Sequence, residues 1–212
     1  KKVIKKNNDF KIYIYNTHQL EEYSNSNVSN YDASPNVLMA SYILKEKLND
    51  LNIPTIVEQT NINQILDTNN WKYNYSYKAS KMLIEDALSK NDSLKYIIDL
   101  HRDSLPKDKT TLINNNVKYA KILFVVGLEH ENYESNLQIA EKLNEIINSK
   151  IPNISKGVLK KGGKGNNGIY NQDLNSNAML IELGGPENTI DEVTNSLNII
   201  ADSLYDLIKE KS

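Results

Sequence analysis

Apolar residues follow two different spacings along this chain of 212 residues. Short apolar runs, typical of buried β-strands, occur at residues 10–15, 55–57, 96–100, 122–126 and 178–183. Longer segments that repeat apolar residues every three or four positions, as amphipathic helices do, lie at 35–51, 75–89, 133–149 and 189–209. This alternation predicts an α/β fold with a mostly parallel central sheet and helices on both faces. We expect a single domain over residues 1–212, of which residues 1–9 are the start of a linker.

Two of the predicted helices have recognisable starts. Ser34 followed by Pro35 is typical of an N-cap and a first helical turn. Thr189 and Glu192 have the spacing of a capping box, in which each side chain bonds the backbone N–H of the other residue. We therefore expect helices to begin at these two positions.

Two segments interrupt the strand and helix pattern. Residues 60–74 are polar and contain Trp71, which predicts a surface loop or the edge of a substrate groove. Residues 156–173 combine lysines with several glycines. A phosphate-binding loop needs its glycines directly before a helix, and no helix is predicted there. We therefore interpret this second segment as a mobile basic loop.

Composition narrows the range of functions. The formal net charge of -2 gives no general attraction to nucleic acids or anionic membranes. The absence of cysteine excludes disulfides, thiolate catalysis and cysteine-ligated metals. The sequence has no signal peptide and no apolar run of about 18 residues, the length that a membrane span requires.

Residues suited to catalysis lie at or beside the ends of three predicted strands. His18 follows the first strand, His101 ends the third, and Glu182 lies near the end of the last. Open α/β sheets place their active sites at the carboxyl ends of strands, and imidazoles and carboxylates are ligands of catalytic zinc. We therefore expect His18 and His101 to bind Zn²⁺. Glu182, in a partly apolar setting that raises its pKa, is placed to act as general base.

The residues leave the third zinc ligand open. Glu21 or Glu22, three and four positions after His18, can reach the same ion, and Glu58 at the end of the second strand is a further candidate. His130 also follows a strand, and we expect it at the rim or the surface.

Arg102 is the only arginine in the sequence. Its guanidinium suits a role that lysine cannot fill, such as a two-pronged contact with a carboxylate. We expect Arg102 to take part in catalysis, and Arg102 and Asp103 to orient His101 or the substrate.

Four segments together resemble the stage II sporulation protein P family, whose members are peptidoglycan hydrolases related to the zinc-dependent N-acetylmuramoyl-L-alanine amidases. The segments are Asn-Thr-His-Gln-Leu-Glu-Glu-Tyr at 16–23, Asp-Leu-His-Arg-Asp-Ser at 99–104, Tyr-Asn-Gln-Asp-Leu at 170–174 and Ile-Glu-Leu-Gly-Gly at 181–185. They occur in the order found in the family. In the wider amidase family the last strand carries Glu-x-Gly-x-x-x-Asn, which Glu182, Gly184 and Asn188 match.

The chain departs from the wider amidase family at the first helix. In that family a zinc-binding glutamate opens this helix, whereas here the helix opens with Pro35 and Asn36. The third ligand must come from elsewhere, and Glu21 is the residue we expect.

The resemblance implies an activity and a biological setting. The activity is cleavage of the amide between N-acetylmuramic acid and L-alanine in peptidoglycan, with cleavage of stem-peptide cross-links as an additional activity. The cofactor is zinc, and the partner is the sporulation protein D transglycosylase. The resemblance also implies an extracytoplasmic protein with a membrane anchor upstream of this fragment, acting between the mother-cell and forespore membranes during engulfment.

Two other functions would use the same residues. A zinc carboxypeptidase or deacetylase would place these ligands around a different small substrate. A non-catalytic wall-binding module would keep the amidase-like scaffold without hydrolysis, and it has no need for a carboxylate such as Glu182 beside the metal.

Overall fold

A central sheet organises the computed structural model, which describes residues 9–26, 34–131 and 133–210. Its six strands lie in the order β2-β1-β3-β8-β6-β7. Their bounds are β1 (Ile12–Tyr15), β2 (Thr55–Val57), β3 (Tyr96–His101), β6 (Ile122–Gly127), β7 (Ser155–Lys161) and β8 (Ala178–Leu183). β6 and β8 are antiparallel, and every other neighbouring pair is parallel. The prediction of a mostly parallel sheet is confirmed.

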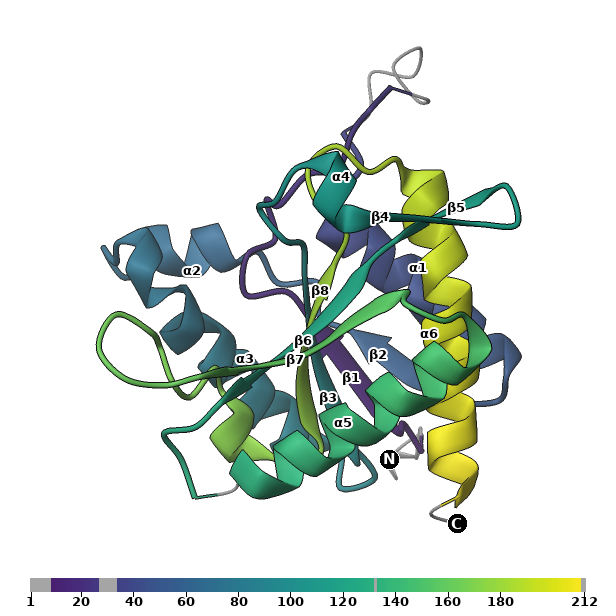
Figure 1. The fold of residues 1–212 in the computed structure, drawn as a ribbon. Coiled ribbons are helices and arrows are strands. Elements are labelled where there is room, and N and C mark those ends of the chain that lie inside the picture. Colours follow the sequence, from purple (N-terminus) through teal and green to yellow (C-terminus); the bar gives the residue numbers. More distant parts are fainter. Residues whose placement is uncertain (1–8, 27–33, 132, 211–212) are drawn as a thin grey trace, which may run out of the picture.

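Helices cover both faces of this sheet, as the sequence predicted (Figure 1). One face carries α1 (Val37–Asp50), α5 (Tyr133–Lys150) and α6 (Ile190–Glu210), and α6 packs against both of the others. The other face carries α3 (Ser76–Lys90), next to the short helices α2 (Ile62–Thr68) and η2 (Tyr73–Tyr75). Smaller elements complete the chain: α4 (Lys107–Thr110), the hairpin of β4 (Thr111–Asn114) and β5 (Val117–Ala120), and η3 (Gln172–Leu174).

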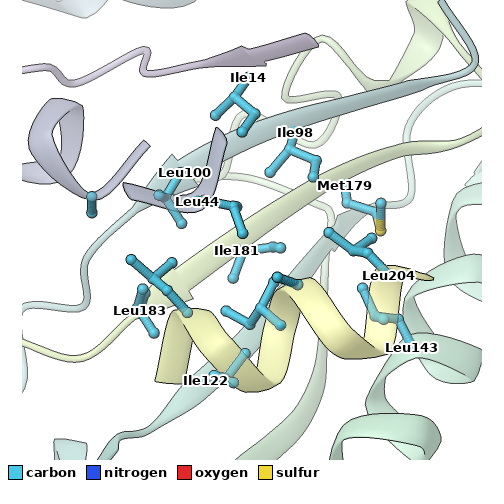
Figure 2. Packing of buried hydrophobic residues seen from close by; sticks show 14 of the residues in the cluster. Ile14, Leu44, Ile98, Leu100, Ile122, Leu143, Met179, Ile181, Leu183 and Leu204 are labelled. Carbon is cyan, nitrogen blue, oxygen red and sulfur yellow. The ribbon is translucent and has the colours of Figure 1, made fainter. Parts of the chain in front are cut away.

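The main hydrophobic core lies between the sheet and α1, α5 and α6 (Figure 2). Ile98 and Leu100 of β3 and Ile181 of β8 contribute to it, and all three are fully buried. Each such side chain contributes roughly 1.5–3 kcal/mol to folding. Since side chains alternate along a strand, Asp99 and His101 point to the opposite face, toward α3.

The two predicted helix starts have different outcomes. At α6 the capping box is present, because Thr189 N donates to Glu192 Oε2 at 3.1 Å and Glu192 N donates to Thr189 Oγ1 at 3.3 Å. At α1 the predicted N-cap Ser34 is wrong. The side chain of Asn36 accepts a hydrogen bond from Met39 N at 3.0 Å and caps the helix instead. Asn and Ser cap helices equally well, so the helix begins two residues later than the proline suggested.

Two segments predicted as loops contain regular structure. α2 occupies the middle of residues 60–74, where Ile62 and Leu66 are buried four positions apart on one helix face. β7 occupies the first part of the stretch at 156–173 that was predicted to be a mobile loop. Its lysines obscured the strand pattern, but charged side chains are common on edge strands, where they discourage pairing with another sheet.

The β4–β5 hairpin was not predicted from the sequence. Its turn consists of Asn115 and Asn116, which have φ values of 48° and 62°. Tight hairpin turns require such left-handed conformations, and Asn adopts them more readily than most residues. The Asn-Asn pair between two short apolar segments was therefore an available signal.

The parallel strands β1, β3 and β8 end at the same edge of the sheet, which we call the carboxyl edge. β6 and β7 run in the opposite direction and end at the other edge. The residues that follow β1 and β3 are thereby brought close to Glu182 of β8. Residues 1–8 of the predicted linker lie outside the described residues. In the described part of the chain, no helix combines the length and apolar character that crossing a membrane requires.

Candidate metal centre and catalytic site

Three predicted metal ligands meet at the carboxyl edge: His18, Glu21 and His101. One ligand atom of each lies within 4.8 Å of the ligand atoms of the other two. The Glu21 carboxylate sits between the two imidazoles, with Oε1 3.5 Å from His18 Nδ1 and Oε2 3.4 Å from His101 Nδ1. His101 is buried, whereas His18 and Glu21 are partly exposed, so the cluster is open to solvent on one side. We refer to these three residues as the ligand cluster.

The loop after β1, residues 16–22, is fixed in place by local and long-range contacts. Thr17 N donates to Asp99 Oδ1 at 3.0 Å, which joins the loop to β3. Glu21 N donates to the carbonyl oxygen of His18 at 3.1 Å, and this turn brings the Glu21 carboxylate beside the His18 ring. The sequence spacing of three residues is therefore what allows both side chains to face one ion.

Asp99 is the residue of this site that the sequence analysis missed. Its Oδ1 lies 3.0 Å from His101 Nε2, and its Oδ2 accepts a hydrogen bond from Thr17 Oγ1 at 2.7 Å. A carboxylate behind a metal-binding histidine fixes the ring tautomer and leaves the other ring nitrogen for the metal. That nitrogen is His101 Nδ1, which faces Glu21. The two-residue spacing of Asp99 and His101 on a strand was the available signal, because it places both side chains on one face.

The charges around the ligand cluster favour a bound cation. Burial raises the pKa of Glu21, but hydrogen bonds from His101 and His18 outweigh this effect and lower the pKa to about 2. Burial lowers the pKa of His101, but the carboxylates of Asp99 and Glu21 outweigh it and hold this pKa well above its ordinary value. Two carboxylates beside the imidazoles thus attract positive charge. Either a proton or a divalent ion supplies such a charge.

Arg102 and Asp103 fasten the segments around the cluster. Arg102 N donates to Glu21 Oε2 at 2.9 Å, and Arg102 Nε donates to the carbonyl oxygen of Glu22 at 2.6 Å. Asp103 Oδ2 pairs with Lys156 Nζ at 2.8 Å, which ties the end of β3 to β7. The Arg102 side chain therefore bonds the backbone of the loop that carries Glu21, and a role toward the substrate stays a prediction.

Glu182, the predicted general base, lies on the strand next to His101. The register of β3 and β8 sets the Cα atoms of His101 and Glu182 opposite each other, so both side chains leave the same face of the sheet. Glu182 Oε2 is buried and has no hydrogen-bond partner among the described residues. Burial raises the pKa of Glu182, His101 opposes the rise, and Glu21 adds to it. A carboxyl group with a raised pKa and a free oxygen is suited to exchanging protons.

Two segments that carried the family resemblance build the frame of the site. After β8, Gly184 adopts a φ of 66°, and Asn188 Oδ1 accepts a hydrogen bond from the next glycine N–H at 2.8 Å. The Glu-x-Gly-x-x-x-Asn pattern thus forms a tight turn directly behind Glu182. In the other segment, Gln172 Oε1 accepts a hydrogen bond from Gly127 N at 2.9 Å and attaches this segment to β6.

The remaining candidates lie outside the ligand cluster. Glu22 is exposed, and its carboxylate is not among the grouped ligand atoms. Glu58 accepts a hydrogen bond from Tyr13 Oη at 2.6 Å and is also outside the group. His130 follows β6 and, because β6 is antiparallel to β8, it lies at the opposite edge of the sheet. Among the alternatives for a third ligand, the geometry therefore favours Glu21.

The ligand cluster fits zinc in the chemistry of its donors. Catalytic zinc sites use three protein ligands from histidine, glutamate or aspartate and keep one position open. Calcium and magnesium instead prefer sets of six or more oxygen ligands. His18, Glu21 and His101 supply two imidazoles and one carboxylate around a point that solvent can reach, and Asp99 supports one imidazole from behind.

Comparison with known proteins reveals likeness in sequence and in fold. The family profile described as Stage II sporulation protein P matches residues 2–205. Stage II sporulation protein P of Bacillus subtilis (strain 168) is 36% identical over 198 residues, which make up 90% of this chain and 49% of that protein. The chain therefore spans about half the length of this curated relative.

A solved structure resembles the fold at low sequence identity. The CwlD amidase from Clostridioides difficile, in complex with the GerS lipoprotein, matches with a TM-score of 0.57 and 14% identity. The match covers 94% of this chain and 97% of that one. It extends the similarity to the architecture of the whole sheet and its helices.

Proposed function

The chain belongs to the stage II sporulation protein P family, and from that premise we propose that it is a zinc-dependent peptidoglycan hydrolase. The bond it cleaves is the amide between N-acetylmuramic acid and L-alanine. The observation that carries this proposal is the convergence of His18, Glu21 and His101 within 4.8 Å, beside Glu182 on the adjacent strand. Zinc hydrolases need these two parts: three ligands with an open position, and a carboxylate that handles protons.

The residues of the chain have separate tasks in this reaction. His18, Glu21 and His101 hold the metal, and a zinc ion in such a site supplies Lewis acidity and lowers the pKa of water. Glu182 accepts a proton from the attacking water while the oxygen of this water bonds to the scissile carbonyl carbon. When the carbon–nitrogen bond breaks, Glu182 donates this proton to the amine of L-alanine. The products are a muramoyl carboxylate and a free stem peptide.

Asp99 and Arg102 hold the metal ligands in position during this reaction. Asp99 holds His101 Nε2, so His101 Nδ1 stays directed at the metal position. Arg102 bonds the backbone at Glu22 and, through its own N–H, the carboxylate of Glu21. Both are positioning residues, because each acts through a ligand.

Metal analysis and product analysis of the purified protein test the proposal. We expect one equivalent of zinc per chain, and release of intact stem peptides from purified peptidoglycan, identified by mass spectrometry. Chelation should abolish release, and zinc should restore it. Iron in place of zinc would overturn the choice of metal. Release of single amino acids or acetate would indicate a carboxypeptidase or deacetylase, and wall binding without any product would indicate a binding module.

Family membership also suggests where the protein acts. We propose action in the extracytoplasmic space between the mother-cell and forespore membranes, with an anchor upstream of this fragment and sporulation protein D as partner. A fluorescent fusion of the complete protein in sporulating cells should mark the engulfing membrane. Retention of the purified partner on the immobilised protein tests the contact, and a cytoplasmic signal or no retention would contradict these two assignments.

A further inference from the structure

The surroundings of the ligand cluster differ on its two sides. On the side of His18, the ring of Tyr73 stacks on the imidazole with ring centroids 5.1 Å apart and planes inclined by 22°. Tyr73 belongs to η2 and is 55% exposed, so its outer surface is free for a ligand. An exposed aromatic ring beside a candidate metal site provides a flat apolar surface for a substrate.

The segment that carries Tyr73 is fixed to the loop of the ligand cluster. Gln19 Nε2 donates to the carbonyl oxygen of Thr60 at 2.8 Å, and Gln19 Oε1 accepts a hydrogen bond from Ile62 N at 2.8 Å. Ser76 Oγ donates to the carbonyl oxygen of Tyr73 at 2.6 Å. The ring of Tyr73 therefore keeps its position relative to His18.

On the side of Glu182, two leucines of the sheet are accessible to solvent. Leu123 pairs in register with Glu182 and is partly exposed. Leu159 of β7 pairs with Val125, which packs with Tyr170 on the α3 side of the sheet. Leu159 is 42% exposed. Leu123 and Leu159 thus form an apolar floor on the same face as Glu182.

Lys161 lies on this face at the end of β7. It pairs with Gly127, two residues after Val125, so its side chain leaves the sheet on the same side as Leu159. Lys156 and Lys160 form ion pairs with Asp103 and Glu141, whereas no ion pair of Lys161 is found in the described part of the chain. Lys161 is therefore available to an anionic ligand.

The proposed mechanism determines which half of the substrate lies on each side. Glu182 gives its proton to the leaving nitrogen, so the leaving stem peptide must lie on the side of Glu182. The strand order places β1 with His18 on one side of β3, and β8, β6 and β7 on the other. The acyl half of the substrate must then lie on the side of His18.

Resting on the proposed function, we infer that the substrate crosses the α3 face of the sheet in one direction, from the carboxyl edge beside His18 toward the end of β7. The N-acetylmuramoyl sugar stacks on Tyr73, and the stem peptide extends over Leu123 and Leu159 toward Lys161, which binds the α-carboxylate of the D-glutamate that follows L-alanine. Strand spacings put the Cα of Lys161 roughly 16 Å from that of Glu182. The two extended residues from the scissile nitrogen to the D-glutamate cover about 7 Å, and the side chains of Glu182 and Lys161, which leave the same face, reach over the remainder.

Three synthetic substrates separate the two contacts. The first is N-acetylmuramoyl-L-alanyl-γ-D-glutamyl-L-lysine, the second has the glutamate α-carboxyl amidated, and the third has lactoyl in place of the sugar. We expect Lys161→Gln to raise KM about tenfold for the first and third substrates and to leave the amidated one unchanged. Lys161→Arg should restore binding. The control Lys160→Gln, on the opposite face of β7, should have no effect.

Tyr73→Ala should show the complementary pattern. We expect its KM to rise about tenfold for the two sugar-containing substrates and to stay unchanged for the lactoyl analogue. Tyr75→Ala, in the same short helix, is the matched control, and zinc content is measured to show that His18 is undisturbed. The inferred direction is wrong if Tyr73→Ala raises KM only when the glutamate carboxyl is free and Lys161→Gln raises it only when the sugar is present. It is also wrong if the change in KM of neither variant depends on the substrate.

Wild-type turnover separates this inference from the proposed function. Cleavage by the wild-type protein, together with the wrong pattern in the variants, overturns the direction alone. Absence of cleavage for all three substrates by the zinc-loaded protein overturns both.

Discussion

Strands β3 and β8 present two contrasting faces built from the same two segments of chain. Toward α1, α5 and α6, Leu100 and Ile181 are fully buried in the main hydrophobic core (Figure 2). Toward α3, Asp99, His101 and Glu182 occupy the alternate positions. Within one strand, adjacent residues therefore belong to the core and to the candidate site.

This contrast shows how the fold supports a polar cluster next to a hydrophobic core. Burying carboxylates and imidazoles is unfavourable unless they are paired or bind a metal. The apolar face offsets this cost and holds the strands rigidly, so the polar side chains keep their spacing. Substitutions one residue apart should accordingly have different consequences. A substitution on the apolar face should lower stability, and one on the polar face should lower zinc binding or hydrolysis.

The largest effect should follow from removing a histidine of the ligand cluster. In His101→Ala or His18→Ala, zinc and hydrolysis should be lost together, because the metal loses one of three ligands. Metal content and peptide release measured on the same preparation check this, and circular dichroism should show a retained fold. His130→Ala, at the opposite edge, is the control. Stoichiometric zinc in either variant would exclude that histidine as a ligand.

Glu182→Gln should retain zinc and lower the rate of hydrolysis by about 10²–10⁴-fold. Glutamine preserves the shape of the side chain but cannot accept a proton, and the deficit should approach the upper limit because the same group serves both proton transfers. Rates of peptide release at saturating substrate measure the effect. Glu187→Gln, on the exposed loop after β8, should behave like the wild type. Loss of zinc in Glu182→Gln would mean that this residue is a ligand and that the assigned roles are wrong.

Glu21→Gln should weaken zinc binding more than the loss of a residue behind the ligands, which typically costs about 10–100-fold. Glutamine offers a neutral oxygen in place of a charged one between the two imidazoles. Competition with a chelator of known affinity measures the dissociation constant. Glu22→Gln is the matched control, because this neighbour is exposed and outside the cluster. Equal zinc affinity of the two variants would contradict the assignment of Glu21.

Leu100→Ala tests the apolar face next to His101. Truncating a fully buried leucine should lower the free energy of unfolding by about 2–5 kcal/mol. Urea denaturation of the zinc-loaded protein measures this loss. The folded variant should keep one equivalent of zinc, since His101 and Asp99 point away from the core. Loss of zinc without loss of stability would show that the two faces are not separable.

Asp99→Asn should have the smallest effect of this series on the site. The amide keeps an oxygen for His101 Nε2 and Thr17 N, but it removes the negative charge that makes the imidazole a stronger ligand. We expect zinc affinity or activity to fall about 10–100-fold. The control Asp86→Asn changes an exposed ion pair with Lys90 and should change neither quantity. Wild-type affinity and activity in Asp99→Asn would show that this carboxylate does not support His101.

The sequence predicted the elements whose patterns are local. The apolar runs identified β1, β2, β3, β6 and β8, and the spacing of Thr189 and Glu192 identified the start of α6. The prediction failed for β7, α2 and the β4–β5 hairpin, where lysines or asparagines hide short apolar patterns. In these cases the strand or helix is stabilised by its neighbours in the sheet, on α3 or on α6, which a local pattern does not contain.

The sequence by itself determined the family of the chain, the order of most strands and helices, and the histidines and glutamate with suitable chemistry. These features depend on residue identity and on the local spacing of apolar residues. The sequence named Glu21 as the expected third ligand, but only the tertiary structure showed its carboxylate beside His18 and His101. Only the tertiary structure decided that Asp99 lies behind His101 and that Tyr73 stacks on His18. Each of these contacts depends on strand register and on turns that bring distant segments to within a few ångströms, and no single segment of the sequence encodes such distances.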